Sequence, residues 1–171
     1  MVLPVLTGIE RQLLSFLVLE SEILISLALE VSALGSTIFA AIVIAGLWYM
    51  GDRETAEELF FSLVTVNIIV RGVKSLVSRP RPQGAVTGSF TYSFPSGHAA
   101  TAFLMASVLS ARYPGLRRFL YGLAALIALT RVLLGLHYLT DVLAGSVIGL
   151  GIGYLVNNRE EMRRLTGKLS F

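Results

Sequence analysis

The chain has 171 residues, a length typical of one domain, and it is 54% hydrophobic but only 15% charged. Soluble domains carry about a quarter charged residues, so a mean hydropathy of +0.74 excludes an ordinary soluble globule and indicates a membrane protein. The absence of cysteine excludes disulfides and thiolate chemistry, and the net charge of +3 lies in clusters between apolar runs, which favours membrane flanks over nucleic-acid binding.

The N-terminal segment, residues 1–20, is expected to form an amphipathic helix that lies in the membrane interface. Its aliphatic residues at helical spacing are Leu13, Leu14, Leu17 and Val18. Glu10 and Arg11 interrupt this apolar run, so it does not predict a confident span.

Five apolar runs follow, and each is a candidate membrane span. They cover approximately residues 23–50, 60–73, 98–111, 116–135 and 137–156. Lipid tolerates no unpaired backbone, so the expected fold is an all-α integral membrane bundle. The long first run and the N-terminal segment leave five to six transmembrane helices possible. We therefore predict a single domain over 1–171, with the bundle at 21–156 and a polar tail at 157–171.

The basic residues predict an orientation for this bundle. One side holds the turns after the first and third runs and the tail, with Arg53, Arg112, Arg117, Arg118, Arg159, Arg163, Arg164 and Lys168. The other side holds Arg11, Arg71, Lys74, Arg79, Arg81 and Arg131, and those of them that belong to motifs with a chemical role are removed from the count. The remaining bias predicts a cytoplasmic C-terminus in a cell membrane, with the motifs facing the outer side.

Three short motifs lie where apolar runs meet outward loops. The first is Lys74 followed after six residues by Arg81-Pro82, and the second is the run 94–98, Phe-Pro-Ser-Gly-His. The third is Arg131, His137 and Asp141 at spacings of six and four. Cations so close to hydrocarbon are costly, so each needs a partner or a function.

The third motif indicates an activated histidine. On a helix His137 and Asp141 share a face, and a carboxylate there can hold the imidazole in one tautomer. We expect His137 to begin a helix. Arg131 is six residues earlier, which is off that face, so a break near Gly135 is needed for both side chains to enter one pocket.

The second motif is typical of an anion site. Ser96 is a good N-cap, Gly97 lets a ligand approach the backbone, and free N–H groups at a helix start attract phosphate. With the cations Lys74 and Arg131 nearby, this arrangement suits a phosphoryl group, and His98 would be the general acid for its leaving oxygen.

Together the three motifs resemble the signature of the type 2 phosphatidic acid phosphatase family, which is Lys-x6-Arg-Pro, Pro-Ser-Gly-His and Ser-Arg-x5-His-x3-Asp. That family includes membrane lipid phosphatases, glucose-6-phosphatase and vanadium haloperoxidases. The match runs from Lys74 to Asp141 and departs at one position, because Thr130 stands where the family usually has serine.

The resemblance implies a metal-independent phosphatase without a cofactor. His137 would attack phosphorus and form a phosphohistidine, Asp141 would orient it, and His98 would protonate the departing lipid oxygen. The phosphoryl oxygens would be held by Lys74, Arg81, Ser96, Gly97 and Arg131. Arg79 is not a fixed position of the motif, and we expect it to be solvated.

The expected substrate is a membrane lipid, and several substrates stay open. They are an undecaprenyl-type diphosphate, phosphatidylglycerophosphate and phosphatidic acid, with the first two favoured by the outward site and short loops. A lipid-linked phosphotransferase on the same scaffold is the alternative function. No feature of the sequence selects an oligomeric state.

Overall fold

A computed structural model describes residues 8, 10, 12, 21–82 and 91–167, with side chains as far as residue 158. Over these residues the protein is helical. The α-helices are α2 (Glu22–Ala33), α3 (Thr37–Tyr49), α4 (Arg53–Val77), α5 (Gly97–Arg112), α6 (Arg117–Leu133) and α7 (Leu139–Gly167), and a short 3-10 turn (Pro114–Leu116) precedes α6. The interfacial helix expected at 1–20 lies largely outside the described residues.

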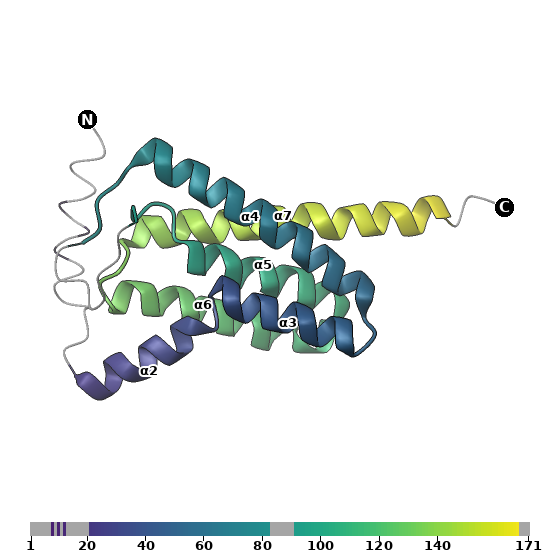
Figure 1. The fold of residues 1–171 in the computed structure, drawn as a ribbon, viewed down its shortest axis with the longest axis horizontal. Helices are drawn as coiled ribbons and strands as arrows, with labels where there is room; N and C mark the ends of the chain where they lie inside the picture. The colour runs from purple at the N-terminus through teal and green to yellow at the C-terminus, as the bar shows by residue number, and fades with distance from the viewer. Residues whose placement is uncertain (1–7, 9, 11, 13–20, 83–90, 168–171) are drawn as a thin grey trace.

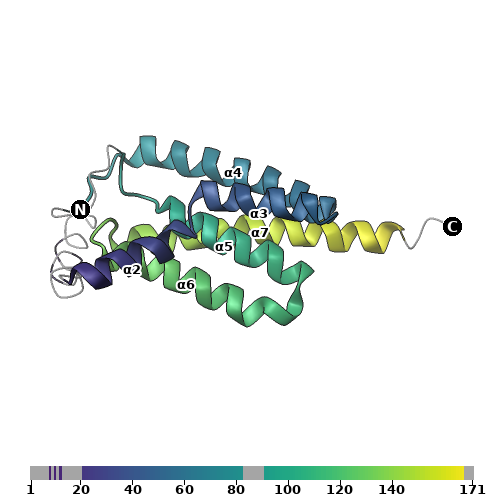
Figure 2. The ribbon, with the colours of Figure 1, turned by 60° about the horizontal axis from the view of Figure 1, so that its bottom comes forward.

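Helix α5 is the centre of the bundle. It contacts α3, α4, α6 and α7 (Figures 1 and 2), and residues along nearly its whole length are buried. Helices α4 and α6 end at the left of Figure 1, where α5 and α7 begin, so four helix ends meet there. The C-terminal part of α7 extends beyond the opposite end of the bundle.

Glycines on α7 let its backbone lie directly against α5. A Cβ on Gly145, Gly149 or Gly153 would collide with Ser96, Ala100 or Ser107 of the facing helix, respectively. Small residues at such an interface are the usual means of close helix packing in lipid, where no hydrophobic effect drives helices together. This contact fixes the N-terminus of α7 beside the N-terminus of α5.

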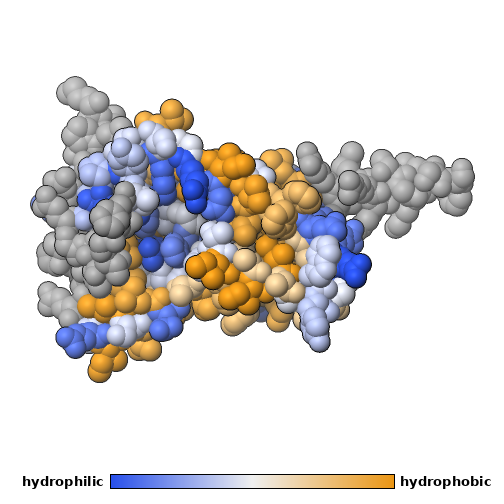
Figure 3. All heavy atoms as spheres, in the orientation of Figure 1, coloured by the Kyte–Doolittle hydropathy of each residue, from blue (hydrophilic) through white to orange (hydrophobic). Residues whose placement is uncertain are grey.

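The outer surface of the bundle is apolar. Ile38, Phe61, Ile68 and Val147 are each at least 65% exposed, and apolar side chains gather over the middle of the face shown in Figure 3. In water this surface would be strongly unfavourable, whereas lipid accepts it. By length and composition, α4 and the Leu139–Asn158 part of α7 can each cross a membrane; the bent pair α2–α3 is a third candidate.

The first apolar run is not one continuous span. It is divided into α2 and α3 by a 47° bend. Leu34, Gly35 and Ser36 form the break, and the Ser36 hydroxyl caps α3 by accepting a hydrogen bond from the Phe39 N–H at 3.1 Å. The sequence at 23–50 is apolar on both sides of the break, so composition alone did not reveal it.

Candidate active site

The structure brings the three sequence motifs together at one end of the bundle. Lys74 lies in the last turn of α4, Gly97 and His98 begin α5, Arg131 lies in the last turn of α6, and Asp141 lies in the first turn of α7. Arg81 comes from the segment after α4. Residues far apart in the sequence therefore line one site.

The turn between α6 and α7 aims both Arg131 and His137 into this site. Gly135 has φ of 63°, a left-handed conformation that glycine adopts without strain. The carbonyl of Arg131 then accepts hydrogen bonds from the N–H groups of Leu136 and His137, each at 3.1 Å. The predicted break at Gly135 is present, but His137 does not begin a helix, because α7 starts two residues later at Leu139.

Asp141 closes the first turn of α7 from within. One carboxylate oxygen, Oδ2, accepts the Tyr138 N–H at 2.9 Å, as in the second half of a capping box. The same oxygen lies 3.5 Å from His137 Nδ1, and the backbone carbonyl of Asp141 accepts the Ser96 N–H at 2.9 Å. The carboxylate is fully buried, so it faces His137 with a fixed orientation.

The neighbours of His137 indicate which of its ring nitrogens carries the proton. Arg81 Nη1 lies 3.3 Å from Nε2, and a guanidinium can only donate, so Nε2 must be the unprotonated nitrogen. The proton is then on Nδ1, facing Asp141, where the separation is at the outer limit of a hydrogen bond; the described residues offer Nδ1 no other partner. Burial lowers the pKa of His137 to about 4; Arg81 and Arg131 add to the shift, and Asp141 opposes it. The imidazole is therefore neutral at pH 7, and the lone pair of its Nε2 is directed at Arg81.

Arg81 and Lys74 are held by backbone carbonyls. Arg81 donates from Nη1 to the Leu136 carbonyl at 2.7 Å and from Nε to the Thr91 carbonyl at 2.9 Å. Lys74 Nζ donates to the Tyr92 carbonyl at 2.6 Å. Burial lowers the pKa of Arg81, while Asp141 opposes that shift. Neither cation is saturated by these neutral partners, so both can bind an anion.

Arg131 is a buried cation with spare hydrogen-bonding capacity. Its Nη1 donates to the Ser32 hydroxyl on α2, and its buried Nε has no hydrogen-bond partner among the residues that the structure describes. Ser96 caps α5, where its hydroxyl accepts the Ala99 N–H at 3.5 Å. A bound oxyanion would supply the acceptor that this Nε lacks within the described part of the chain.

His98 is partly exposed and lies among the same cations. It interacts electrostatically with Lys74, Arg81, Arg131 and His137. Its backbone packs against Gly35, where an added Cβ would meet the His98 carbonyl oxygen at 3.1 Å. The break between α2 and α3 therefore packs against the backbone of His98. The sequence did not indicate this contact.

Arg79 corrects an expectation, because it is not solvated. It is 7% exposed and its Nη1 donates to Asp141 Oδ1 at 2.6 Å, while its Nη2 pairs with Glu10 Oε2 at 2.5 Å. Sequence reasoning missed both Arg79 and Glu10. One signal was available: Arg79 and Arg81 each precede a proline, which restricts them to extended backbone and keeps this cationic segment out of α4.

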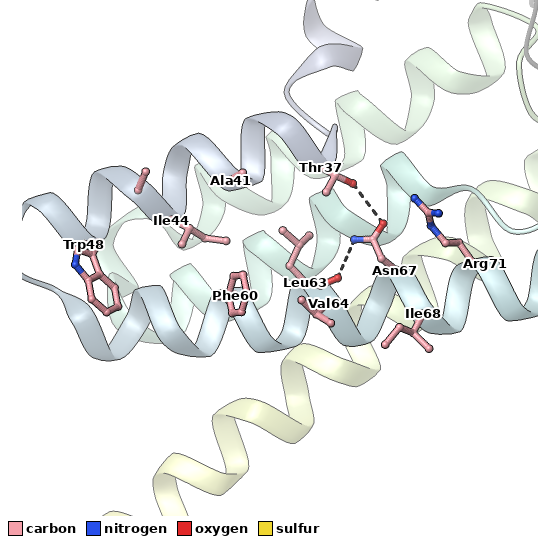
Figure 4. Close-up of a pocket in the computed structure, with 11 residues that line it drawn as sticks. Thr37, Ala41, Ile44, Trp48, Phe60, Leu63, Val64, Asn67, Ile68 and Arg71 are labelled. Atoms are coloured by element: carbon pink, nitrogen blue, oxygen red, sulfur yellow. Dashed lines mark hydrogen bonds between the residues drawn. The ribbon is translucent and has the colours of Figure 1, made fainter.

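An apolar groove lies between α3 and α4, with a volume of about 770 Å³. Trp48 stands at one end of it and Arg71 at the other (Figure 4). Near the Arg71 end, the Thr37 hydroxyl donates to Asn67 Oδ1 at 3.4 Å, which pairs two polar groups in a mostly apolar wall (Figure 4). Arg71 is one helical turn before Lys74, so the groove leads towards the site. Over the described residues no group of three or more histidines and carboxylates is placed to bind a metal ion.

Comparison with known proteins identifies a family for this arrangement. The sequence model of the PAP2 superfamily matches residues 55–164, which include every residue of the three motifs. Phosphatidylglycerophosphatase B of Bacillus subtilis is 33% identical over 140 residues, covering 74% of this chain and 69% of that protein. Lipid A 1-phosphatase of Rhizobium johnstonii is 30% identical over 102 residues, covering 53% of this chain and 42% of that protein.

The fold has a close counterpart among solved structures. The crystal structure of a transmembrane PAP2-type phosphatidylglycerolphosphate phosphatase from Bacillus subtilis matches with a TM-score of 0.81. The match covers 91% of this chain and 86% of that one, at 24% identity.

Proposed function

Because the chain belongs to the PAP2 superfamily, we propose that it is a membrane lipid phosphatase that works through a phosphohistidine at His137. The observation that supports this most directly is the pairing of His137 Nε2 with Arg81 and of Nδ1 with Asp141. A neutral imidazole with its lone pair directed at a cationic phosphate site is arranged for attack on phosphorus.

In the first step, the bond from Nε2 to phosphorus forms as the bond from phosphorus to the lipid oxygen breaks. His98 donates its proton to that oxygen, and the Nδ1–H of His137 faces Asp141 as the ring becomes cationic. In the second step water attacks phosphorus, His98 takes its proton, and the bond to Nε2 breaks. Inorganic phosphate leaves and both histidines return to their starting states.

Charge on the phosphoryl oxygens is stabilised by the surrounding donors. We assign this role to Lys74, Arg81 and Arg131, with Ser96 and Gly97 supplying the start of α5. The Nε of Arg131 supports this assignment, because it has no partner among the described residues and a bound phosphate would complete its hydrogen bonding. Donors fixed before the reaction need no reorganisation in the transition state.

We further propose that a hydrocarbon chain of the substrate lies in the α3–α4 groove. Apolar walls, a cation at the end nearer the site, and exposure to lipid suit an anionic lipid. An undecaprenyl-type diphosphate and phosphatidylglycerophosphate are the two substrates that we propose, and the names of the relatives lend weight to the second. Phosphate transfer to a lipid acceptor is the alternative outcome of the same phosphohistidine.

The site is proposed to face the outer side of the cell membrane and the C-terminus the cytoplasm. Arg79 is buried in the site, so it joins Lys74, Arg81 and Arg131 among cations that do not report on orientation. The tail and the turns at Arg53 and Arg112 then hold most of the remaining positive charge. Reporter fusions to the C-terminus should read as cytoplasmic, and an external reading would refute the orientation.

The test of function is release of phosphate from a panel of lipid phosphates in detergent with a chelator present. Turnover should persist with chelator, and His137→Ala should lower kcat by about 1000-fold or more. A labelled phosphoenzyme should form in the wild type and be absent from that variant. Arg112→Gln, which alters an exposed ion pair at the opposite end, is the matched control. Strict dependence on added divalent metal, or full turnover by His137→Ala, would overturn the mechanism; a labelled acceptor lipid would favour the phosphotransferase.

A further inference from the structure

The proposed mechanism does not use the buried ion pair of Arg79 with Glu10, which lies next to Asp141 on the side away from His137's phosphate site. Arg79 forms ion pairs with two carboxylates at once, Glu10 at 2.5 Å and Asp141 at 2.6 Å. The side chains of Arg79 and Glu10 are each 7% exposed, and that of Asp141 is fully buried. The three charges therefore interact with one another largely shielded from water.

The same pair holds the first turn of α7 from outside. Glu10 Oε1 accepts the Thr140 N–H at 3.0 Å, and Arg79 Nη1 donates to the Thr140 hydroxyl at 2.7 Å. The Arg79 guanidinium also stacks 3.9 Å from the ring centre of Tyr138. Every residue from 138 to 141 except exposed Leu139 is thus contacted by the pair.

Arg79 is itself fixed in place. Its carbonyl accepts hydrogen bonds from the Ser93 N–H at 2.8 Å and the Ser93 hydroxyl at 3.3 Å. A buried ion pair costs desolvation and often adds nothing to stability compared with apolar residues. Its geometry, directed at one catalytic carboxylate, points to a role in the reaction.

We propose that Glu10 and Arg79 are positioning residues for the phosphatase reaction, which hold Asp141 in register with His137 and set the charge behind it. The proposal rests on the proposed function. It gives the N-terminal segment a part in the chemistry, through Glu10, that the three motifs do not contain.

The charge balance of this cluster makes the proposal testable. Glu10, Arg79 and Asp141 together contribute one net negative charge behind the imidazole. The other charged or titratable groups near His137 are Arg81 after α4, His98 on α5 and Arg131 on α6, and they are unchanged in all of these variants. Lys74 on α4, which interacts with Asp141, is also unchanged. Removing Glu10 makes the cluster neutral, and removing Arg79 makes it more negative.

The experiment compares Glu10→Gln, Arg79→Gln and the double variant in kcat, KM and the pH dependence of kcat/KM. Each single variant should lose about 10- to 100-fold in kcat with KM nearly unchanged, because Asp141 is misplaced. The acidic limb of kcat/KM should move by about 1 pH unit, to lower pH in Glu10→Gln and to higher pH in Arg79→Gln. In the double variant the limb should return close to its wild-type position while kcat stays low.

A purely structural role would lower the amount of folded enzyme without moving the limb in opposite directions, and that result overturns the proposal. Arg112→Gln removes a cation at the far end and should change neither quantity. If Arg79→Gln does not fold, Arg79→Lys is the substitute, because it keeps the charge but cannot pair with Glu10 and Asp141 through two separate nitrogens. Its kcat should fall while the acidic limb of kcat/KM stays in place. A wild-type kcat in Arg79→Lys refutes the proposal. The two proposals can fail separately. If His137→Ala loses turnover but the acidic limb of kcat/KM does not move in opposite directions in Glu10→Gln and Arg79→Gln, the positioning role is refuted and the proposed function stands.

Discussion

Replacing Gly145 by alanine should damage catalysis through the α5–α7 contact. An added Cβ would lie 3.2 Å from the Ser96 carbonyl carbon and 3.3 Å from its nitrogen, and closer still to its oxygen. Ordinary van der Waals separation of such atoms is about 3.5–4.0 Å, so the two backbones must part by about 1 Å. Backbone cannot rotate away as a side chain can, so the N-terminus of α7 must move.

That movement acts directly on the site, because Ser96 N–H donates to the Asp141 carbonyl. A misplacement of 1 Å can cost about 100-fold in rate, and overpacking costs about 1–3 kcal/mol of stability. Gly145→Ala should therefore lose about 100-fold in kcat, measured by phosphate release in detergent, with a lower melting temperature. Gly151→Ala is the matched control on the same helix, because nothing lies within 4 Å of its added Cβ, and it should keep wild-type turnover. Equal kcat in the two variants would refute the packing argument.

Three further predictions follow from the same geometry. The value of kcat/KM should fall as pH drops towards about 4, the pKa of His137, because protonation of Nε2 removes the lone pair that attacks phosphorus in the proposed mechanism; a rate that rises on acidification would contradict this. The pKa of His137 in the folded protein lies below its pKa of about 6.5 in the unfolded chain. As pH falls, the unfolded chain therefore takes up this proton before the folded protein does. The imidazole therefore contributes its full stability above pH 6.5, and up to about 3 kcal/mol should be lost between pH 6.5 and 4 in denaturant titrations; His137→Gln should remove that slope. Ala41→Phe should fill the α3–α4 groove and raise KM several-fold for long-chain substrates but not for a short-chain soluble analogue; equal KM changes for both would remove the groove from substrate binding.

The three motifs and the all-α fold could be predicted from the sequence because each depends on local information. Apolar runs give the helices, and the spacing of Lys74, Arg81, Arg131, His137 and Asp141 indicates which helix ends must converge. The turn at Gly135 was also predictable, since two functional side chains six residues apart cannot share a face of one helix. PAP2 membership, implied by the motif resemblance, is confirmed by the family match.

Other features depend on tertiary contacts that no local pattern reports. Arg79 reads as a solvated charge until its partners are known, and Glu10 reads as an interruption in an amphipathic helix. Their pairing joins residues 69 positions apart. The bend between α2 and α3 was hidden for a related reason, because hydropathy averages over a break that is made of small and apolar residues.

The support of the site from the first third of the chain bears on how variants of this protein should be interpreted. Glu10, Ser32 and Gly35 contact Arg79, Arg131 and His98, respectively, yet all three precede the segment matched by the family, residues 55–164. A fragment trimmed to that segment would keep every motif residue and lose these supports. Sequence changes at the three positions should therefore impair the enzyme even where a motif search reports an intact active site.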